Sequence, residues 1–368
     1  MRSVCWRLSA WDPDIASVRY RAAIPALHLA ARGVTSRLSS ASYGVLEPMP
    51  PDAVVFVKTF ADRDVELSRR AAEERVPVLL DVCDNVFAPG YRAHSAENLR
   101  RMAEVATALV TTGSALADVL RVELGDNVPL HVVPDPVETP VDVRAAARIV
   151  LQQRLQRGLG ERRADIPRGI AALLRRGLVP ALQRRVRRAP TAAADRPQVL
   201  WFGNVGSVEP RFGIVNLADI ASELEAAARE SPFRLLVVTG DRDAYREYIE
   251  PLALESAFEP WDRLTIFRHV RRSTLVILPN SRDEFSVCKS ANRATLALSQ
   301  GVPVVATRIP SLDPFAGSVL FDDFEGGVVT YLRDRALVAD HVSRAREVIA
   351  REFAPAVVAE RWRETLGL

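Results

Sequence analysis

Short apolar runs alternate with amphipathic segments along the first 135 residues. The runs have the length and composition of buried strands, and the segments between them repeat apolar positions with the period of a helix. The predicted strands are 3–9, 53–57, 78–80, 108–110 and 130–133, and the predicted helices are 17–32, 63–75, 96–106 and 114–123. Apolar strands that alternate with amphipathic helices are typical of parallel βαβ units with right-handed crossovers.

The second half of the chain repeats this pattern. Its predicted strands are 199–202, 234–238, 275–278 and 302–306, and its predicted helices are 214–230, 262–271 and 288–300, with a helical tail over 326–365. Two halves of this kind predict an α/β protein with two Rossmann-like domains that face a cleft. We expect an N-terminal domain over 1–140, a C-terminal domain over 198–352, and a final helix over 353–368 that packs back towards the N-terminal domain.

A basic segment separates the two halves. Residues 143–190 contain thirteen arginines and two acidic residues, a balance of +11, whereas the whole chain of 368 residues carries +3. We predict an arginine-rich helical insertion or linker over 141–197, broken by prolines. Its arginines either face water or form a basic surface that lies on anionic lipid. Nucleic acid is not expected as a partner, because residues 143–190 include no aromatic side chain on which bases could stack.

Cysteine usage and hydropathy indicate the compartment. The three cysteines, Cys5, Cys83 and Cys288, have no zinc-site or disulfide spacing and fit a reducing environment. No apolar run reaches the length of a transmembrane helix, and charged residues interrupt the N-terminus before a signal peptide could form. We therefore expect a cytoplasmic protein, which the basic segment could attach to the inner face of a membrane.

The loop after the strand 275–278 holds the densest group of polar residues. It leads into the predicted helix 288–300, whose free N–H groups and partial positive charge favour a phosphate. Lys289 adds a compact positive charge, and Arg293 is expected on the same helical face. Ser290 could cap the helix or bind phosphate. The alternative interpretation is a capped helix with surface charges.

Lysine is nearly absent from the sequence. Of 49 basic residues only two are lysines, Lys58 and Lys289, and the other 47 are arginines. Because the arginine excess looks compositional, a single arginine carries little information. The two lysines are therefore the more specific candidates for a functional site.

Three segments resemble GT-B glycosyltransferases, in particular the family 4-like (group 1) enzymes. ILPNSRDEFSVCKSANRATLALSQGVPVVAT (277–307) is similar to their donor-binding segment, VLWFGNVGSVEPRFGI (199–214) to the first strand and loop of their C-terminal domain, and VVPDPVE (132–138) to the end of their N-terminal domain. The resemblance covers nearly the whole chain in element order. It implies the GT-B fold and a nucleotide-sugar bound by the C-terminal domain, with no cofactor and no required metal.

The donor-binding residues implied by the resemblance belong to two loops. They are Gly203, Asn204 and Arg211 in the first, and Lys289, Ser290, Asn292 and Arg293 in the second. Glu284 takes the place of the first of two family glutamates, but Asn292 stands where the second would be. Phe212 replaces a basic residue of the family turn, and Asn204 replaces an arginine. Basic residues of the second loop could supply the missing charge, while Asn292 suits a ribose or a sugar.

The N-terminal domain is expected to hold the acceptor. Asp81 and Asp84 follow a predicted strand, where the family often has a histidine that touches the donor sugar. They could bind sugar hydroxyls, one could act as a base in an inverting mechanism, or they could cap the next helix. Lys58 ends a neighbouring strand and could steer a diphosphate or an anionic acceptor. Arg19 and Arg21 lie at the first strand–helix junction, and their spacing predicts at most one in the site.

The resemblance implies transfer of a sugar from a nucleotide-sugar to a glycan or a lipid-linked acceptor, in surface polysaccharide or glycoconjugate synthesis, with retention at the anomeric carbon. The residues expected to carry the reaction are Glu284, Asp84 and Asp81. A GT-B-like binding or scaffold protein without catalysis is the alternative, because the family pattern is altered at three positions. An enzyme of another class on the same architecture, such as a sugar epimerase, is a third possibility.

Overall fold

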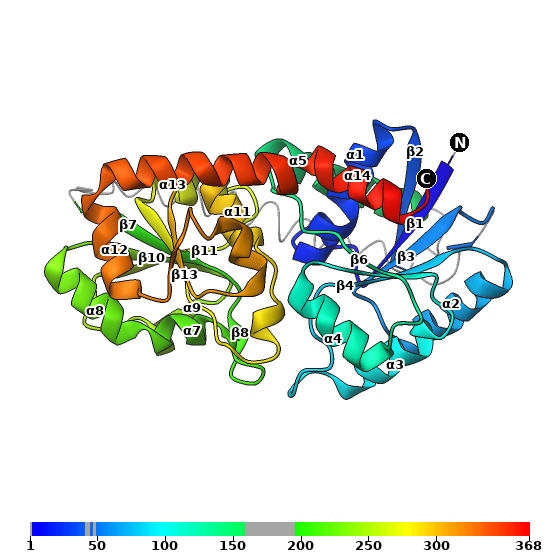
Figure 1. The fold of residues 1–368 in the computed structure, drawn as a ribbon, viewed down its shortest axis with the longest axis horizontal. Coiled ribbons are helices and arrows are strands. Elements are labelled where there is room, and N and C mark those ends of the chain that lie inside the picture. The colour runs from blue at the N-terminus through cyan, green and yellow to red at the C-terminus, as the bar shows by residue number, and fades with distance from the viewer. Residues whose placement is uncertain (1, 41–44, 47–48, 159–195) are drawn as a thin grey trace.

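The protein, described by a computed structural model over residues 2–40, 45–46, 49–158 and 196–368, has two lobes (Figure 1). Within these residues each lobe holds a parallel sheet of six strands with helices packed on both faces. The predicted α/β architecture of two Rossmann-like domains is therefore confirmed. None of the helices in the described residues is long and apolar enough to cross a membrane.

The N-terminal sheet has the order β2-β1-β3-β4-β5-β6. Its strands are β1 (Arg2–Leu8), β2 (Val34–Ser39), β3 (Ala53–Val57), β4 (Val78–Val82), β5 (Ala108–Thr111) and β6 (Leu130–Val132). The helical elements around it are η1 (Val18–Ala23), α1 (Ile24–Ala30), α2 (Asp62–Glu73), α3 (Ala93–Ala103) and α4 (Ser114–Leu124). Alternate residues pack on opposite faces, as with Trp6 and Cys5, so apolar cores form on both sides.

The C-terminal sheet has the order β11-β10-β7-β12-β13-β14. Its strands are β7 (Gln198–Phe202), β10 (Arg234–Thr239), β11 (Ser256–Pro260), β12 (Leu275–Leu278), β13 (Val304–Ala306) and β14 (Leu320–Phe321). The helical elements around it are α7 (Ile214–Asp219), α8 (Ala221–Glu230), α9 (Arg242–Tyr248), α10 (Ile266–Arg272), α11 (Asn292–Ser299), η3 (Pro310–Phe315), α12 (Phe324–Arg333) and α13 (Arg335–Val348). The chain runs from β7 outward to β11 and then returns to the other side of β7 as β12. The carboxyl ends of β7 and β12 therefore form a switch point, where open α/β sheets bind ligands.

Two segments connect the domains. The helix α5 (Pro140–Gly158) packs Val143 into the C-terminal core and Ala146 and Val150 into the N-terminal core. At the other end of the chain, α13, η4 (Ile349–Phe353) and α14 (Pro355–Thr365) run along one side of the molecule from the C-terminal domain to the N-terminal one (Figure 1). There the Trp362 ring meets Trp6 edge to face, with centroids 5.0 Å apart.

The expected domain bounds remain a prediction, but parts of the two connecting segments can be placed in the structure. The beginning of the predicted insertion (141–158) lies in α5, and the helix over 353–368 packs on the N-terminal core. The rest of the insertion, over 159–195, lies outside the described residues.

Some elements differ from the sequence prediction. The strands β2 and β11 were not expected, because their polar residues interrupt the apolar pattern and both strands lie at a sheet edge. The predicted helix 214–230 is two helices that meet at Ile220, whose backbone is not helical.

Candidate active site between the domains

Charged residues follow two strands at the carboxyl edge of the N-terminal sheet. Lys58 comes directly after β3, and its backbone N–H donates to the carbonyl oxygen of Asp81 over 3.0 Å. Its φ of +47° lies in the left-handed region, which lysine rarely adopts. Asp84 lies in the β4–α3 loop (83–92), and its carboxylate contacts the Lys58 ammonium group. The neighbouring strand ends thus bring a cation and an anion together.

The β12–α11 loop (279–291) faces these residues from the C-terminal domain. Asp283 accepts the N–H groups of Phe285 and Ser286 over 3.0 and 2.7 Å, which fixes the single helical turn η2 (Ser286–Cys288). Burial would raise the pKa of Asp283, but the hydrogen bonds that its carboxylate accepts from Ser281, Ser286 and Phe285 hold that pKa below its ordinary value.

The sequence prediction for this loop requires a correction. Lys289 has an extended backbone, and α11 begins only at Asn292. The predicted helix over 288–300 is too long, so the expectation that Lys289 and Arg293 share one helical face is wrong. Lys289 and Ser290 instead each contact a carboxylate of the N-terminal domain, and these tertiary contacts outweigh the local helical pattern.

Lys289 meets the same carboxylate as Lys58. Its Nζ donates to Oδ1 of Asp84 over 2.7 Å, while Lys58 contacts Oδ2. Burial would raise the pKa of Asp84, but the Lys289 and Lys58 ammonium groups outweigh it and hold that pKa below its ordinary value. Burial lowers the pKa of Lys289, whereas the Asp84 carboxylate outweighs burial at Lys58 and raises its pKa. Both lysines of the chain therefore meet at one acid between the domains.

Aromatic rings surround the Lys289 ammonium group. Its Nζ lies 3.7 Å from the ring centroid of Phe285 and 5.0 Å from that of Phe212, distances at which a cation is attracted to a ring face. Tyr91 of the β4–α3 loop lies 6.0 Å from Phe285, centroid to centroid. Phe212, which stands where the resemblance expects a basic residue, thus contacts the cation that the opposite loop supplies.

Arg293 lies at the switch point of the C-terminal sheet. Its Nη1 donates to the carbonyl oxygen of Phe202, the last residue of β7, over 3.3 Å. A Cβ at Gly203 would stand 3.1 Å from that nitrogen, so glycine lets the backbone approach the guanidinium closely. Burial lowers the pKa of Arg293 to about 10. No carboxylate pairs with it among the residues that the structure describes.

Arg21, Asp81 and Ser290 belong to a separate buried network. Arg21 donates to Asp81 over 2.7 Å and to Asp135 over 3.3 Å, and the Ser290 hydroxyl donates to Asp135 over 2.7 Å. Asp81 is fully buried and Arg21 is 1% exposed. Burial raises the pKa of Asp81, although the Arg21 guanidinium opposes the shift. Arg21 and Asp81 therefore stabilise the N-terminal domain as a buried ion pair, and neither side chain is accessible to a substrate.

Arg19 has a similar structural position. Its Nε donates to Glu138 over 2.6 Å, and the Tyr20 hydroxyl donates to the other oxygen of that carboxylate over 2.8 Å. The guanidinium also lies 5.5 Å from the ring centroid of Trp261 in the C-terminal domain. Arg19 and Arg21 belong to η1, which is covered on all sides, so that all of its residues are buried.

The remaining candidates are dispersed. Arg211 turns away to Asp219 of α7, with its Nε 2.9 Å from the carboxylate, and its side chain is 41% exposed. Glu284 and Asn204 are exposed, and Asn292 is half-buried at the start of α11. Glu284 takes part in the interface through its backbone carbonyl, which accepts a hydrogen bond from Asn85 over 2.9 Å.

Several residues of the interface were not found from the sequence. They are Tyr91, Phe285, Asn85 and Asp135. Asp135 lies in the VVPDPVE segment, so an acidic residue within a recognised motif was the available signal; the aromatic residues gave none. Among the described residues, no three histidine, cysteine or acidic side chains are grouped as a metal site requires.

Comparisons with known proteins rest on structure. No protein-family model matches the sequence, and no curated protein is significantly similar to it. HepE of Anabaena, solved with UDP-glucose, superposes with a TM-score of 0.64 at 12% identity, covering 100% of both chains. TarM of S. aureus, solved with UDP, gives 0.56 at 12% identity, over 88% of this chain and 57% of TarM. UDP-GlcNAc 2-epimerase of Neisseria meningitidis, bound to UDP-GlcNAc, gives 0.52 at 14% identity, over 100% and 99%.

These likenesses establish the fold. The chain has the GT-B fold of HepE and TarM, which confirms the fold that the sequence resemblance implied. At 12–14% identity the comparisons show the fold alone, and an epimerase shares it. The family 4-like assignment stays a prediction.

Proposed function

We propose that this protein is a glycosyltransferase that moves a sugar from a nucleotide-sugar donor to a glycan or lipid-linked acceptor. One observation carries the proposal: the half-buried Arg293 guanidinium lies at the switch point of the C-terminal sheet without a carboxylate partner among the described residues. A half-buried cation without an anionic partner has lost part of its hydration, and a diphosphate would neutralise its charge. HepE and TarM, which share the fold, were solved with UDP-glucose and UDP.

In this proposal the chain stabilises the departing nucleoside diphosphate. Negative charge develops on the diphosphate as the glycosidic bond to it breaks, and fixed cations favour that state. Arg293 and Lys289 supply the charge, and Gly203 leaves room for the Arg293 guanidinium beside the end of β7. The Ser290 hydroxyl already donates to Asp135 and can serve the ligand only as an acceptor or after leaving that carboxylate. We assign Asn204 and Asn292 to the ribose or the sugar.

The N-terminal domain would present the acceptor beside Lys58 and the β4–α3 loop. Its Asp84 is a poor base, because both of its oxygens contact ammonium groups that lower its pKa although burial would raise it. Asp81 is enclosed with Arg21, so we leave it out of the reaction. Glu284 is then the exposed acid that can reach a sugar hydroxyl. Retention of the anomeric configuration and a role in polysaccharide or glycoconjugate synthesis are part of the proposal on the resemblance alone.

A panel of nucleotide-sugars tests this proposal. Each is mixed with the protein at millimolar concentration, first for thermal stabilisation and then, with glycan and lipid-linked acceptors, for release of the nucleoside diphosphate. We expect at least one donor to stabilise the protein and to be turned over. If no nucleotide-sugar or free nucleotide shifts the melting temperature, the proposal is wrong.

A binding protein without catalysis is the second candidate. It is favoured by Asn292 in place of the second family glutamate and by the dispersal of Arg211 and Glu284 from Lys289. Thermal stabilisation by a nucleotide-sugar without release of its diphosphate would support this candidate. An epimerase would instead convert the sugar nucleotide without any acceptor, which NMR of the mixture would detect.

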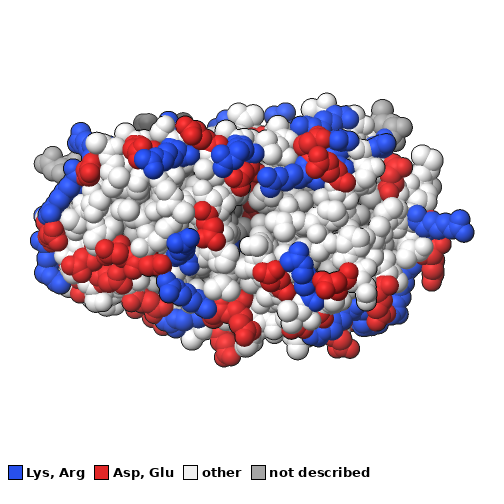
Figure 2. Space-filling model, viewed as in Figure 1, with Lys and Arg blue, Asp and Glu red and all other residues white. Residues whose placement is uncertain are grey.

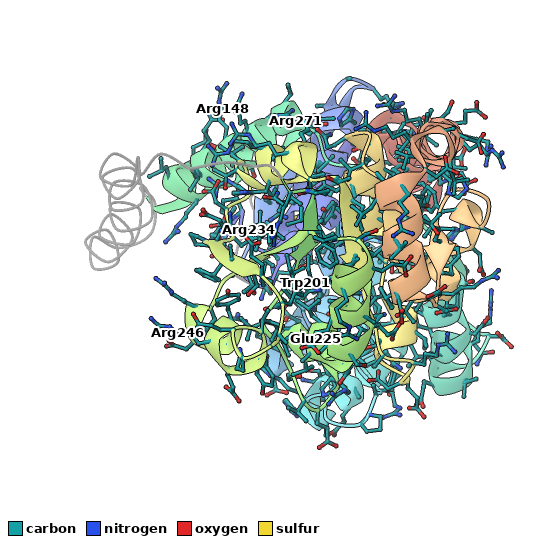
Figure 3. The ribbon with its side chains drawn as sticks, turned by 90° about the vertical axis from the view of Figure 1, so that its left-hand side faces the viewer. Arg148, Trp201, Glu225, Arg234, Arg246 and Arg271 are labelled. Atoms are coloured by element: carbon teal, nitrogen blue, oxygen red, sulfur yellow. The ribbon has the colours of Figure 1, made fainter. Side chains whose placement is uncertain are left out.

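We also propose attachment to an anionic membrane surface through the basic segment. In its described part, α5 exposes Arg144 and Arg148 beside Val141 and Leu155. In the end-on view of Figure 3, Arg148 of α5 and Arg271 of α10 both project on the upper side of the molecule. Basic and acidic side chains are interspersed on the face seen in Figure 2. Co-sedimentation with phosphatidylglycerol vesicles but not with phosphatidylcholine vesicles is expected, and equal binding to both would contradict it.

A further inference from the structure

The carboxylate of Asp84 joins the two domains through the two lysines of the chain. Lys58 belongs to the N-terminal domain and Lys289 to the C-terminal domain, and each contacts a different oxygen of Asp84. One anion therefore faces two cations. The carboxylate is 11% exposed, while Lys289 and Lys58 are 25% and 33% exposed, so the site is sheltered but open to solvent.

The neighbouring acids Asp81 and Asp135 do not pair with the two lysines. They are bound to Arg21 instead. Arg293, four residues beyond Lys289 in the chain, also has no carboxylate partner among the described residues. Asp84 is therefore the one carboxylate that the two lysines share among the ion pairs of the described residues.

We propose that Lys58 and Lys289 form a phosphate-binding site across the two domains, in which the Asp84 carboxylate stands in for the ligand until a phosphate displaces it. A phosphate presents pairs of oxygens on one central atom, as a carboxylate does, and each ammonium group can donate to one of them. A phosphate monoester or a free diphosphate also carries more negative charge than a carboxylate and so satisfies two cations better. The inference rests on the proposed function, which supplies substrates that carry phosphate.

Two features of the lysines support a ligand site. The left-handed φ of Lys58 is unfavourable, and such strain persists where the surrounding structure imposes it, often at functional sites. The Lys289 ammonium group packs over the rings of Phe285 and Phe212, which fix its position and keep it from turning into bulk water. Both cations are thus preorganised around the place that Asp84 occupies.

Displacement of Asp84 would also change the contact between the domains. The β4–α3 loop reaches the C-terminal domain through Asp84 and through Asn85, which donates to the backbone of Glu284. Exchange of the Asp84 contact for a ligand phosphate would therefore link occupancy of the site to the position of this loop.

The test replaces Asp84 by its neutral isostere. Binding of UDP, glycerol 3-phosphate and inorganic phosphate is measured by calorimetry for the wild type and D84N. We expect D84N to bind phosphate probes about tenfold more tightly, because the internal competitor is gone. A gain for UDP alone identifies the donor as the source of the phosphate, and a gain for glycerol 3-phosphate alone identifies the acceptor. D243N, which removes an exposed acid on α9, is the matched control and should leave affinity unchanged.

Further variants link the gain to the lysines. Adding K289M to D84N should abolish the increase in affinity, and K58M in the wild-type background should weaken phosphate binding even if D84N does not fold. Equal or weaker binding of every probe by D84N, or unchanged binding by K58M, would overturn the inference. Sugar transfer together with weaker UDP binding by D84N would leave the proposed function intact. Tighter binding of glycerol 3-phosphate by D84N, without any binding of nucleotides, would support the site and refute the proposed function.

Discussion

Two charged clusters lie near the domain interface, and they differ in charge balance and in exposure. In the first, Arg21 joins Asp81 and Asp135, with one cation for two acids and almost no access to solvent. In the second, Lys58 and Lys289 share Asp84, and both lysines are partly exposed. The two clusters are supplied by the same strand ends, since Asp81 and Asp84 stand three residues apart.

The difference separates structural charges from candidate binding charges. A buried ion whose hydrogen bonds are all made within the chain contributes to one fixed geometry and has nothing left for a ligand. In the second cluster two partly exposed cations share one acid, so an added anion would bind to them favourably. Sequence position alone would place all of these residues in one site, but their partners assign them to different roles.

The largest effect is expected where the closed cluster is broken. R21M leaves Asp81 and Asp135 without their cation and removes the packing of Arg21 over Trp362, whose ring centroid lies 5.2 Å away. Removing one partner of a buried ion pair costs about 3–5 kcal/mol. Urea unfolding should therefore show a loss of that size in the free energy of unfolding.

The matched control for R21M is R121M. Arg121 pairs with Asp118 on the surface of α4, where both side chains are exposed, so its loss should change stability little. Equal stability of R21M and R121M would mean that the first cluster is not a structural one.

Arg293, at the switch point of the C-terminal sheet, should respond in the opposite way to Arg21. R293M removes a half-buried cation that has no carboxylate partner among the described residues, so the free energy of unfolding should stay the same or rise. Affinity for UDP should fall by about tenfold to a hundredfold, since a charged hydrogen bond contributes about 1.5–3 kcal/mol. Calorimetry and urea unfolding on one preparation measure both quantities. Loss of stability with unchanged affinity would place Arg293 among the structural charges.

Lowering the pH should remove the stabilisation that the Asp84 carboxylate provides. Lysine contacts hold its pKa below the ordinary value although burial opposes them, so its stabilising contribution is complete above about pH 4. The contribution is lost as pH falls through the pKa of the folded state. D84N should therefore be less stable than the wild type by about 1–3 kcal/mol at pH 7, and the gap should shrink at pH 3. A gap of the same size at both pH values would contradict this assignment.

Much of the fold was predictable from the sequence because the apolar runs are unambiguous. AVVFV (53–57) is buried along its whole length as β3, as expected of a strand covered on both faces. The edge strand β2 was missed because its serines, threonine and arginine break the apolar pattern. Local pattern thus identifies central strands better than edge strands.

The candidate site was predictable only in part, because it depends on contacts across the two domains. Lys58, Asp84 and Lys289 were each named, but nothing in their spacing indicates that both lysines reach one carboxylate. The helical pattern around Lys289 also gave a wrong prediction, because contacts with the N-terminal domain hold that residue outside α11. Pairing between distant segments is a tertiary property that one sequence does not reveal.

Arg211 tests how far a motif can be carried over without its geometry, and it should show the smallest effect. The resemblance places it in the donor site, but its guanidinium is bound to Asp219 at the surface. Exposed ion pairs contribute about 0.2–1 kcal/mol. R211M should therefore change the free energy of unfolding by no more than that and the affinity for UDP by less than about twofold. A tenfold loss of affinity would show that Arg211 leaves Asp219 for the ligand, which would add Arg211 to the candidate binding cations Arg293, Lys289 and Lys58.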